Sequence, residues 1–174
     1  MYQPSDDSFF FSDFLKTYLS GIKNKSKLKY LDMGTGSGIL SETALSQKIN
    51  RQNILAADID KPSVDFVSRK NFNALKTNLF SKIPTAKKFD LITFNAPYLP
   101  EDKYDKQKDT TGGKNGDEAT LKFLKQAKEY LAKNGKIFLL ISSLTPLKNI
   151  NKFKPKILAK KKIFFEELLI LEIN

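Results

Sequence analysis

The chain has 174 residues, of which 40% are hydrophobic and 28% charged, as is typical of a folded water-soluble domain. It contains neither Cys nor His, which excludes disulfide bonds, Cys- or His-dependent nucleophilic catalysis and an ordinary structural zinc site. The net charge of +11 would suit a nucleic-acid partner. However, Arg51 and Arg69 are the only arginines among 30 basic residues, so a general preference for lysine explains much of this charge.

Apolar runs and helical stretches alternate along the chain, and this alternation predicts an α/β fold with a mostly parallel sheet and helices on both faces. We expect one domain over residues 1–174 and a seven-stranded sheet whose last strand is antiparallel. The expected elements in chain order are a helix over 8–19 capped by Ser5 or Asp6, a strand over 28–32, a helix over 39–47, a strand over 53–58, a helix from Lys61, an edge strand near Leu75 to Leu79, a strand over 90–94, a helix over 117–131 ended by Asn134 and Gly135, a strand over 136–141 and two strands within 156–174.

The location of the protein is predicted from its apolar segments. The longest of them, around 137–141 and 168–171, are far shorter than the roughly 20 residues that span a bilayer. The first residues have no basic region followed by an apolar one, so we expect no secretory signal. We therefore predict a cytoplasmic protein without a membrane partner.

The segment from 99 to 116 is polar, charged and long for a loop of a compact domain. It follows an apolar strand of the predicted sheet, where binding loops are common. We expect it to act as a lid or to bind substrate.

The strongest local motif is a strand that runs into the glycines Gly34, Gly36 and Gly38 and then into a helix. Such a turn lets the backbone approach a nucleotide-like ligand closely. A dinucleotide site would have glycine at position 39, where this chain has Ile39, and Asp32 would repel a pyrophosphate. S-adenosylmethionine carries no phosphate and has two cationic groups, so the same acid favours it as cofactor.

Asp58 supports this interpretation, because it lies twenty residues after Gly38 at the end of the next predicted strand. A carboxylate at that place can accept hydrogen bonds from both ribose hydroxyls. The alternative is that the glycines form only a tight turn and that Asp32 and Asp58 are helix or turn caps.

A second motif, Asn95-Ala96-Pro97-Tyr98, follows the strand over 90–94. It resembles the [Asn/Asp]-Pro-Pro-[Tyr/Phe] motif of methyltransferases that modify planar nitrogens of glutamine or adenine, and it is predicted to be catalytic. The Asn95 side chain and the Ala96 carbonyl would accept the two N–H groups of the substrate, and Tyr98 would stack on its plane. Ala96 replaces the usual proline and so removes a restraint on Asn95. The alternative is a strand that ends in an ordinary proline turn.

Two further segments, Tyr2–Phe9 and Thr111–Glu118, are similar to the Y-x-P-x-[Glu/Asp]-D-[Ser/Thr]-F and G-G-[Arg/Lys]-N-G segments of the HemK-like glutamine methyltransferases of archaea and eukaryotes. The resemblance implies a Rossmann-like class I methyltransferase that uses S-adenosylmethionine, needs no metal and modifies the glutamine of a Gly-Gly-Gln loop in a peptide chain release factor. It also implies a small zinc-binding activator subunit at the sheet edge near Leu75 to Leu79, where Phe80 would add apolar surface. By this resemblance the cofactor site would be lined by Ser8, Asp32, Gly34, Asp58, Asn78, Leu79 and Asn95, with Asn78 where relatives often have Asp beside the adenine. The glycine turn adds Gly36 and Gly38 to the predicted cofactor-binding residues.

Two other functions remain open on the sequence. The Asn95 motif also serves N6-adenine methylation of DNA or RNA, which would use the positive charge, but no target-recognition domain is evident. A non-catalytic cofactor-binding subunit is the third hypothesis, and the presence of both Asn95 and Asp58 argues against it.

Overall fold

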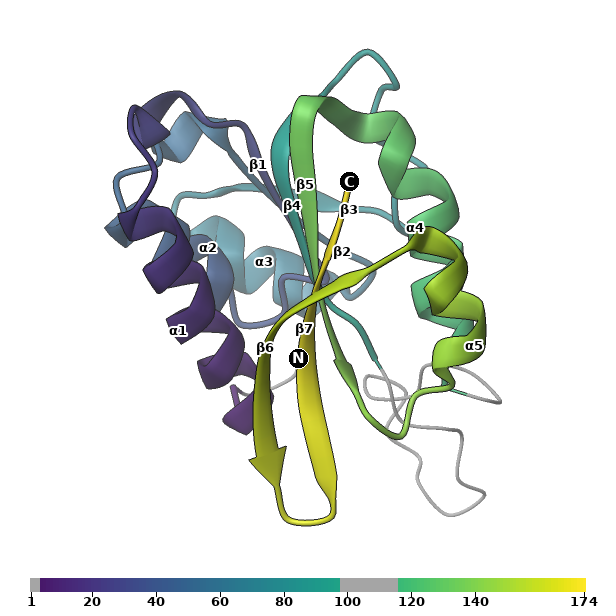
Figure 1. Ribbon diagram of the computed structural model, residues 1–174. Helices are drawn as coiled ribbons and strands as arrows, with labels where there is room; N and C mark the ends of the chain where they lie inside the picture. The colour runs from purple at the N-terminus through teal and green to yellow at the C-terminus, as the bar shows by residue number, and fades with distance from the viewer. Residues whose placement is uncertain (1–3, 98–115) are drawn as a thin grey trace.

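One mixed sheet of seven strands organises the computed structural model, which describes residues 4–97 and 116–174 (Figure 1). The strands are β1 (Tyr30–Met33), β2 (Ile54–Asp58), β3 (Asn73–Lys76), β4 (Phe89–Asn95), β5 (Leu131–Ser142), β6 (Lys156–Ile163) and β7 (Glu166–Ile173). Their order is β3-β2-β1-β4-β5-β7-β6. The first five run parallel, and β7 is antiparallel to both β5 and β6. The predicted fold class is confirmed.

Helices cover both faces of the sheet. They are α1 (Asp6–Ser20), α2 (Ile39–Ser46), α3 (Lys61–Arg69), α4 (Glu118–Ala127) and α5 (Leu147–Ile150), with short 3-10 turns at Lys25–Lys27, Arg51–Asn53, Lys128–Tyr130 and Asn151–Phe153. In Figure 1, α1, α2 and α3 lie on one side of the sheet, and α4 and α5 lie on the other. Strands β1 and β2 are therefore buried at every position, as expected for parallel strands covered on both faces.

The two faces of the sheet have separate apolar cores. Along β5, Ile137, Leu139 and Ile141 point into the core beneath α4, whereas Phe138 and Leu140 point into the core beneath α1. The rings of Phe14 and Tyr18 meet the Phe138 ring edge-on, with centroid distances of 5.2 Å and 4.6 Å. The Phe-rich helix before the first strand, which the sequence predicts, is thus anchored on the middle of the sheet.

The prediction that Asn134 and Gly135 end a helix is wrong. Helix α4 ends at Ala127, the turn Lys128–Tyr130 follows, and β5 begins at Leu131, so both residues lie inside the strand. A Cβ atom on Gly135 would lie 2.7 Å from the backbone oxygen of Phe89. Glycine is needed there because β4 and β5 approach closely beside a register shift, and not because it caps a helix.

The predicted edge strand exists as β3, but its apolar surface is smaller than expected. Phe80 is buried and stacks on Phe123 and Tyr130, with ring centroids 5.6 Å and 4.4 Å away. Phe80 belongs to the core beneath α4 because the chain turns inward after β3. Only the partly buried Leu75 and Leu79 remain near the edge.

No helix within the described ranges has the length and hydropathy needed to cross a membrane.

Candidate active site

The carboxyl ends of the parallel strands bring the predicted site residues to one edge of the sheet. The glycine turn follows β1, Asp58 ends β2 and Asn95 ends β4. The first turn of α1 reaches the same edge, because the Nδ2 of Asn95 donates a hydrogen bond of 3.0 Å to the carboxylate of Asp7. In parallel α/β sheets, ligands bind at this edge.

The glycine turn has the geometry of an open cradle. Gly34 and Gly38 have φ angles of +65° and +81°, which glycine adopts without strain. A Cβ on Gly38 would lie 3.0 Å from Val67, so this glycine also lets the turn pack closely on α3. Gly34 is exposed, and a Cβ there would lie 3.2 Å from the Phe94 ring and 4.0 Å from the backbone oxygen of Asn95. The turn is therefore adjacent to the second motif, as a cofactor next to its substrate requires.

Asp32 lies beneath this turn and ties it to α2. One of its carboxylate oxygens accepts hydrogen bonds from the Thr35 hydroxyl at 2.8 Å and from the Ser41 amide and hydroxyl at 3.1 and 2.7 Å. Burial raises the pKa of Asp32 to about 6, against the lowering effect of the bonds from Ser41 and Thr35. Asp32 therefore does cap the glycine turn and the start of α2, as the alternative interpretation of the sequence proposed. Its charge favours a cation in the cradle through space.

Asp58 joins the end of β2 to the glycine turn. Its two carboxylate oxygens accept hydrogen bonds of 2.8 Å from the backbone amides of Gly36 and Asp60. Burial raises the pKa of Asp58, while these backbone bonds lower it. Each carboxylate oxygen has a second lone pair, so the side chain can still accept ribose hydroxyls, and the residues present fit S-adenosylmethionine.

The predicted adenine-side residues lie next to Asp58. The Thr77 amide donates a hydrogen bond of 2.8 Å to the backbone oxygen of Asp58, and this bond places the following Asn78 and Leu79 beside the end of β2. Asn78 is exposed, and the Thr77 hydroxyl holds the Leu79 carbonyl at 3.0 Å. Their contact with a cofactor stays a prediction.

Asn95 presents an unpaired acceptor. Its Nδ2 is bound to Asp7, but its Oδ1 is buried and accepts no hydrogen bond from the part of the chain that the structure describes. A buried acceptor without a donor costs about 1–3 kcal/mol, so this atom is suited to receive an N–H group from a ligand. Ala96 is buried and Pro97 is partly buried after it. Tyr98 and the rest of the loop up to residue 115 lie outside the described residues.

Asp7 is a site residue that sequence reasoning missed. The predicted neighbour Ser8 is buried, and both its amide and its hydroxyl donate to the Asp7 carboxylate, at 2.6 and 3.2 Å. The only sequence signal was an acid in the segment Tyr2–Phe9, since the partner Asn95 lies 88 residues away in the chain.

Within residues 4–97 and 116–174 no three acidic side chains converge as a metal site requires.

The comparisons with known proteins agree with this geometry. The family model described as "Methyltransferase small domain" matches residues 12–164. The chain belongs to this family. It is therefore a methyltransferase, and S-adenosylmethionine is its cofactor.

Relatives of this methyltransferase carry related names. A "Putative protein N5-glutamine methyltransferase" of Methanocaldococcus jannaschii is 34% identical over 188 residues, which cover 98% of this chain and 90% of the relative. The release factor glutamine methyltransferase of Leptospira interrogans is 29% identical over 73% of this chain, and that of Lactococcus lactis is 29% identical over 66%. The chain spans only 51% and 47% of the length of these two bacterial proteins.

Solved structures share the fold of this methyltransferase at low sequence identity. The ribosomal protein L11 methylase of Lactobacillus delbrueckii superposes with a TM-score of 0.69 at 19% identity, covering 98% of this chain and 80% of that one. The 16S rRNA N2 G1207 methyltransferase of T. thermophilus superposes with a TM-score of 0.66 at 17% identity, covering 99% and 44%.

Proposed function

We propose that this methyltransferase transfers a methyl group to the side-chain amide nitrogen of a glutamine, in the Gly-Gly-Gln loop of a peptide chain release factor. The observation that carries the proposal is the buried Oδ1 of Asn95 beside the glycine turn, which accepts no hydrogen bond from residues 4–97 and 116–174. The names of the archaeal and bacterial relatives support glutamine as the acceptor and a release factor as the substrate.

The chemistry needs positioning more than acid or base catalysis. An amide nitrogen is a weak nucleophile because its lone pair is delocalised, so it must be held in line with the methyl group. When bound, the cofactor would supply an electrophilic methyl group. The amide nitrogen would form its C–N bond as the methyl–sulfur bond breaks, S-adenosylhomocysteine would leave, and the proton given up by the nitrogen would pass to water. Asn95 Oδ1 would accept one N–H of the glutamine, and the Ala96 carbonyl would accept the other. This arrangement needs no histidine, and the chain has none.

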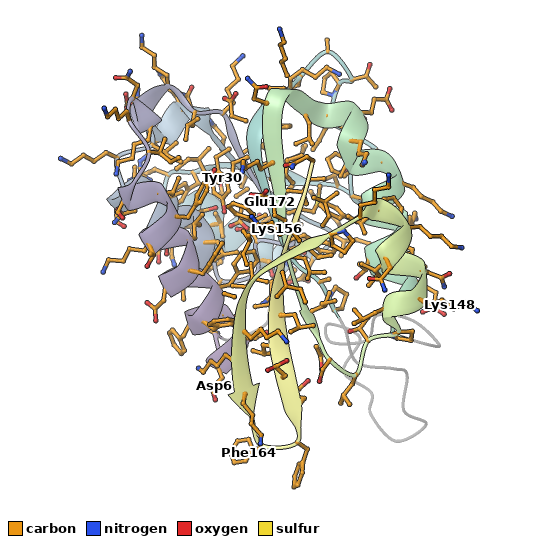
Figure 2. All side chains as sticks on the ribbon, in the orientation of Figure 1. Asp6, Tyr30, Lys148, Lys156, Phe164 and Glu172 are labelled. Carbon is orange, nitrogen blue, oxygen red and sulfur yellow. The ribbon has the colours of Figure 1, made fainter. Side chains whose placement is uncertain are left out.

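The surface around this edge of the sheet favours a protein substrate. Exposed large apolar side chains on five positions border it: Phe9 in α1, Ile59 after β2, Leu144 after β5, and Phe164 and Phe165 in the turn between β6 and β7. Figure 2 shows Phe164 at the tip of that turn, near Asp6 of α1. We propose that these side chains contact the protein substrate.

N6-adenine methylation of DNA or RNA is the second candidate, and the net charge of +11 favours it. Part of this charge is already paired near the site, since Lys161 forms an ion pair with Asp6 and Lys160 with Glu167. An adenine in a duplex must also be flipped out at a cost of a few kcal/mol, whereas a glutamine on an exposed loop needs no such step. We therefore favour glutamine.

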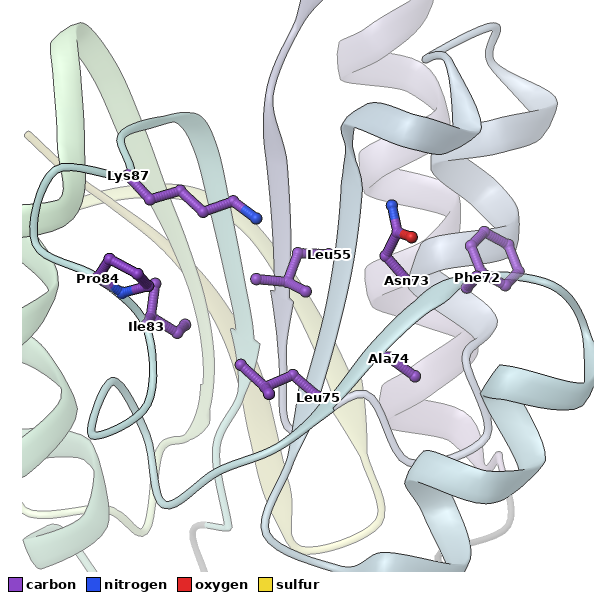
Figure 3. A pocket seen from close by; sticks show the side chains of 8 residues that line it. All are labelled: Leu55, Phe72, Asn73, Ala74, Leu75, Ile83, Pro84 and Lys87. Carbon is purple, nitrogen blue, oxygen red and sulfur yellow. The ribbon is translucent and has the colours of Figure 1, made fainter.

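The proposal includes a small zinc-binding activator subunit at the β3 edge. Beside β3 lies a pocket of about 430 Å³, shown in Figure 3, in which Ile83, Pro84 and Lys87 face Leu55 and Leu75. An unpaired edge strand next to a partly apolar pocket is suited to association with a partner. We also propose that residues 1–174 form a single methyltransferase domain and that the protein acts in the cytoplasm.

Tritium transfer from labelled S-adenosylmethionine tests the function. We expect labelling of the release factor, no labelling of its Gln→Ala loop variant, and none of adenine-containing oligonucleotides. Asn95→Ala should reduce transfer by a factor of about 10² or more while cofactor affinity stays within a few fold, because the lost acceptor positions the substrate. Asn53→Ala is the matched control, since its side chain binds the Ser26 carbonyl before β2, at the opposite edge. Labelling of the oligonucleotides alone would refute the proposal.

A further inference from the structure

The side-chain amide of Asn95 can be placed in two ways that differ little in shape. Its oxygen and its NH₂ group are nearly equal in size, so only hydrogen bonds decide which of them faces the substrate. With Oδ1 toward the substrate, Asn95 accepts an amide N–H. With the amide turned over, its NH₂ group would meet the NH₂ group of the substrate, and neither could accept a hydrogen bond.

We propose that Asp7 is a positioning residue that fixes this orientation and thereby presents Asn95 Oδ1 to the methyl-accepting nitrogen. A carboxylate only accepts hydrogen bonds, so the end of Asn95 that contacts Asp7 must be the NH₂ group. The observed bond is Asn95 Nδ2 to Asp7 Oδ2, at 3.0 Å, and it leaves Oδ1 buried with no donor among the described residues. This inference rests on the proposed role of Asn95 as the acceptor of an amide N–H.

The Asp7 carboxylate is itself held firmly. Its Oδ1 accepts hydrogen bonds from the Ser5 hydroxyl at 2.6 Å, the Ser8 amide at 2.6 Å and the Ser8 hydroxyl at 3.2 Å. Helix α1, which carries Asp7, is packed on the sheet through fully buried side chains such as Phe11 and Leu15. A following proline would restrict the backbone of Asn95, and Ala96 does not, whereas the bond to Asp7 restricts the Asn95 side chain.

Asp7→Asn tests the inference without removing atoms. The oxygen of the new amide can still accept from Ser5 and Ser8, so its NH₂ group would face Asn95. The Asn95 amide would then turn over, point its own NH₂ group at the substrate, and lower kcat by a factor of about 10². Asp6→Asn is the matched control, because Asp6 is the exposed neighbour that pairs with Lys161, and it should keep the wild-type kcat.

Exchanging the two groups should restore the arrangement. Asn95→Asp alone places two carboxylates in contact and should also lower kcat, through repulsion between like charges. In the double variant Asp7→Asn/Asn95→Asp, the amide at position 7 donates to the carboxylate at position 95, whose other oxygen faces the substrate. We expect its kcat to exceed that of either single variant by at least about tenfold, a coupling that independent structural damage would not produce.

A substrate-free measurement separates this inference from the proposed function. The side-chain NH₂ resonances of Asn95 in a ¹⁵N-labelled protein should lie downfield in the wild type and in Asp6→Asn, because they donate to a carboxylate, and should move upfield in Asp7→Asn. Each of three results would overturn the inference. The Asn95 resonances could stay unmoved in Asp7→Asn, Asp7→Asn could keep the wild-type kcat, or the loss of kcat in the double variant could equal the product of the two single losses. If the resonances move as expected and no variant or wild-type protein labels the release factor, the positioning role stands and the proposed substrate is wrong.

Discussion

At the scale of single residues, two buried carboxylates lie on the proposed cofactor side of the site. Asp32 and Asp58 lie at or near the ends of adjacent strands. Burial raises the pKa of both carboxyls, and the charge of Asp58 raises the pKa of Asp32 further. Their oxygens hold the glycine turn through Thr35, Gly36 and Ser41. The turn is thus shaped by the same negative charges that favour a cationic ligand. Keeping these charges in the folded protein without a ligand lowers its stability.

Asp32→Asn should reveal that cost. An unfolded Asp has a pKa near 3.9, and the folded Asp32 has a pKa of about 6, so the folded state binds more protons between about pH 4 and 6. The free energy of unfolding therefore falls as pH rises through this window, by up to about 3 kcal/mol for this group, and the loss persists at pH 7. Asp58 contributes a slope of the same sign.

The variant should lack the Asp32 part of this slope. Urea unfolding at several pH values should show Asp32→Asn gaining stability over the wild type from pH 4 to 7, while calorimetry should show weaker binding of S-adenosylmethionine. Asp13→Asn, at an exposed position of α1, is the control and should follow the wild type. A stability difference between Asp32→Asn and the wild type that does not change with pH would contradict the assigned pKa.

At the scale of elements, the close contact of β4 with β5 sets the position of Asn95. Strand β4 ends in Asn95, and its register with β5 shifts between Phe89 and Leu91, beside Gly135. The glycine has no side chain, and this lets the two backbones approach where the shift occurs. The strand that carries the proposed catalytic motif thus depends on a close contact at its other end, far from Asn95.

Gly135→Ala should destabilise the protein. The added methyl group would lie 2.7 Å from the backbone oxygen of Phe89, which cannot move without shifting β4, so we expect a loss of about 1–3 kcal/mol in the free energy of unfolding. Gly21→Ala is the matched control, because its methyl group would lie 3.7 Å from the nearest atom at an ordinary φ of -80°. Equal stability of the two variants in chemical denaturation would show that the contact is not restrictive.

At the scale of the whole molecule, the site and the proposed partner surface occupy different parts of the sheet. The acceptor motif lies at the carboxyl end of the central strand β4, whereas β3 and β6 are the two edge strands. The pocket lies beside β3, and Leu75 connects it to the core beneath α4. A partner on β3 would also lie close to Asn78 and Leu79, which follow this strand.

Variants on the two edge strands of the sheet, β3 and β6, test the proposed activator surface. Co-expression with the activator should raise the solubility and activity of the chain, and the two proteins should elute together on size-exclusion chromatography. Asn73→Glu, at an exposed position of β3 that lines the pocket, should abolish co-elution, because it places a charge on the edge. Ile157→Glu, on the exposed opposite edge strand β6, should not. Full activity of the chain alone would contradict the need for a partner.

The sequence by itself determined the fold class, and it named polar residues that the structure brings to one edge of the sheet. Gly34, Asp58 and Asn95 could be identified because each follows or ends an apolar strand, and parallel strands bring their carboxyl ends to one edge whatever the details of packing. Local rules therefore sufficed for these residues. They also predicted α1 before the first strand, since its apolar residues repeat with the period of a helix.

Only the tertiary structure decided which residues meet across long separations. The bond between Asp7 and Asn95 joins segments 88 residues apart, and nothing local in either segment marks it. Gly135 had the sequence pattern of a helix end, but its backbone lies against Phe89 of β4. Phe80 had the pattern of an exposed edge residue, but it is buried against Phe123. In each case the outcome depends on which residue, distant in the sequence, lies next to the one in question. Periodicity and propensity along the chain carry no information about such neighbours.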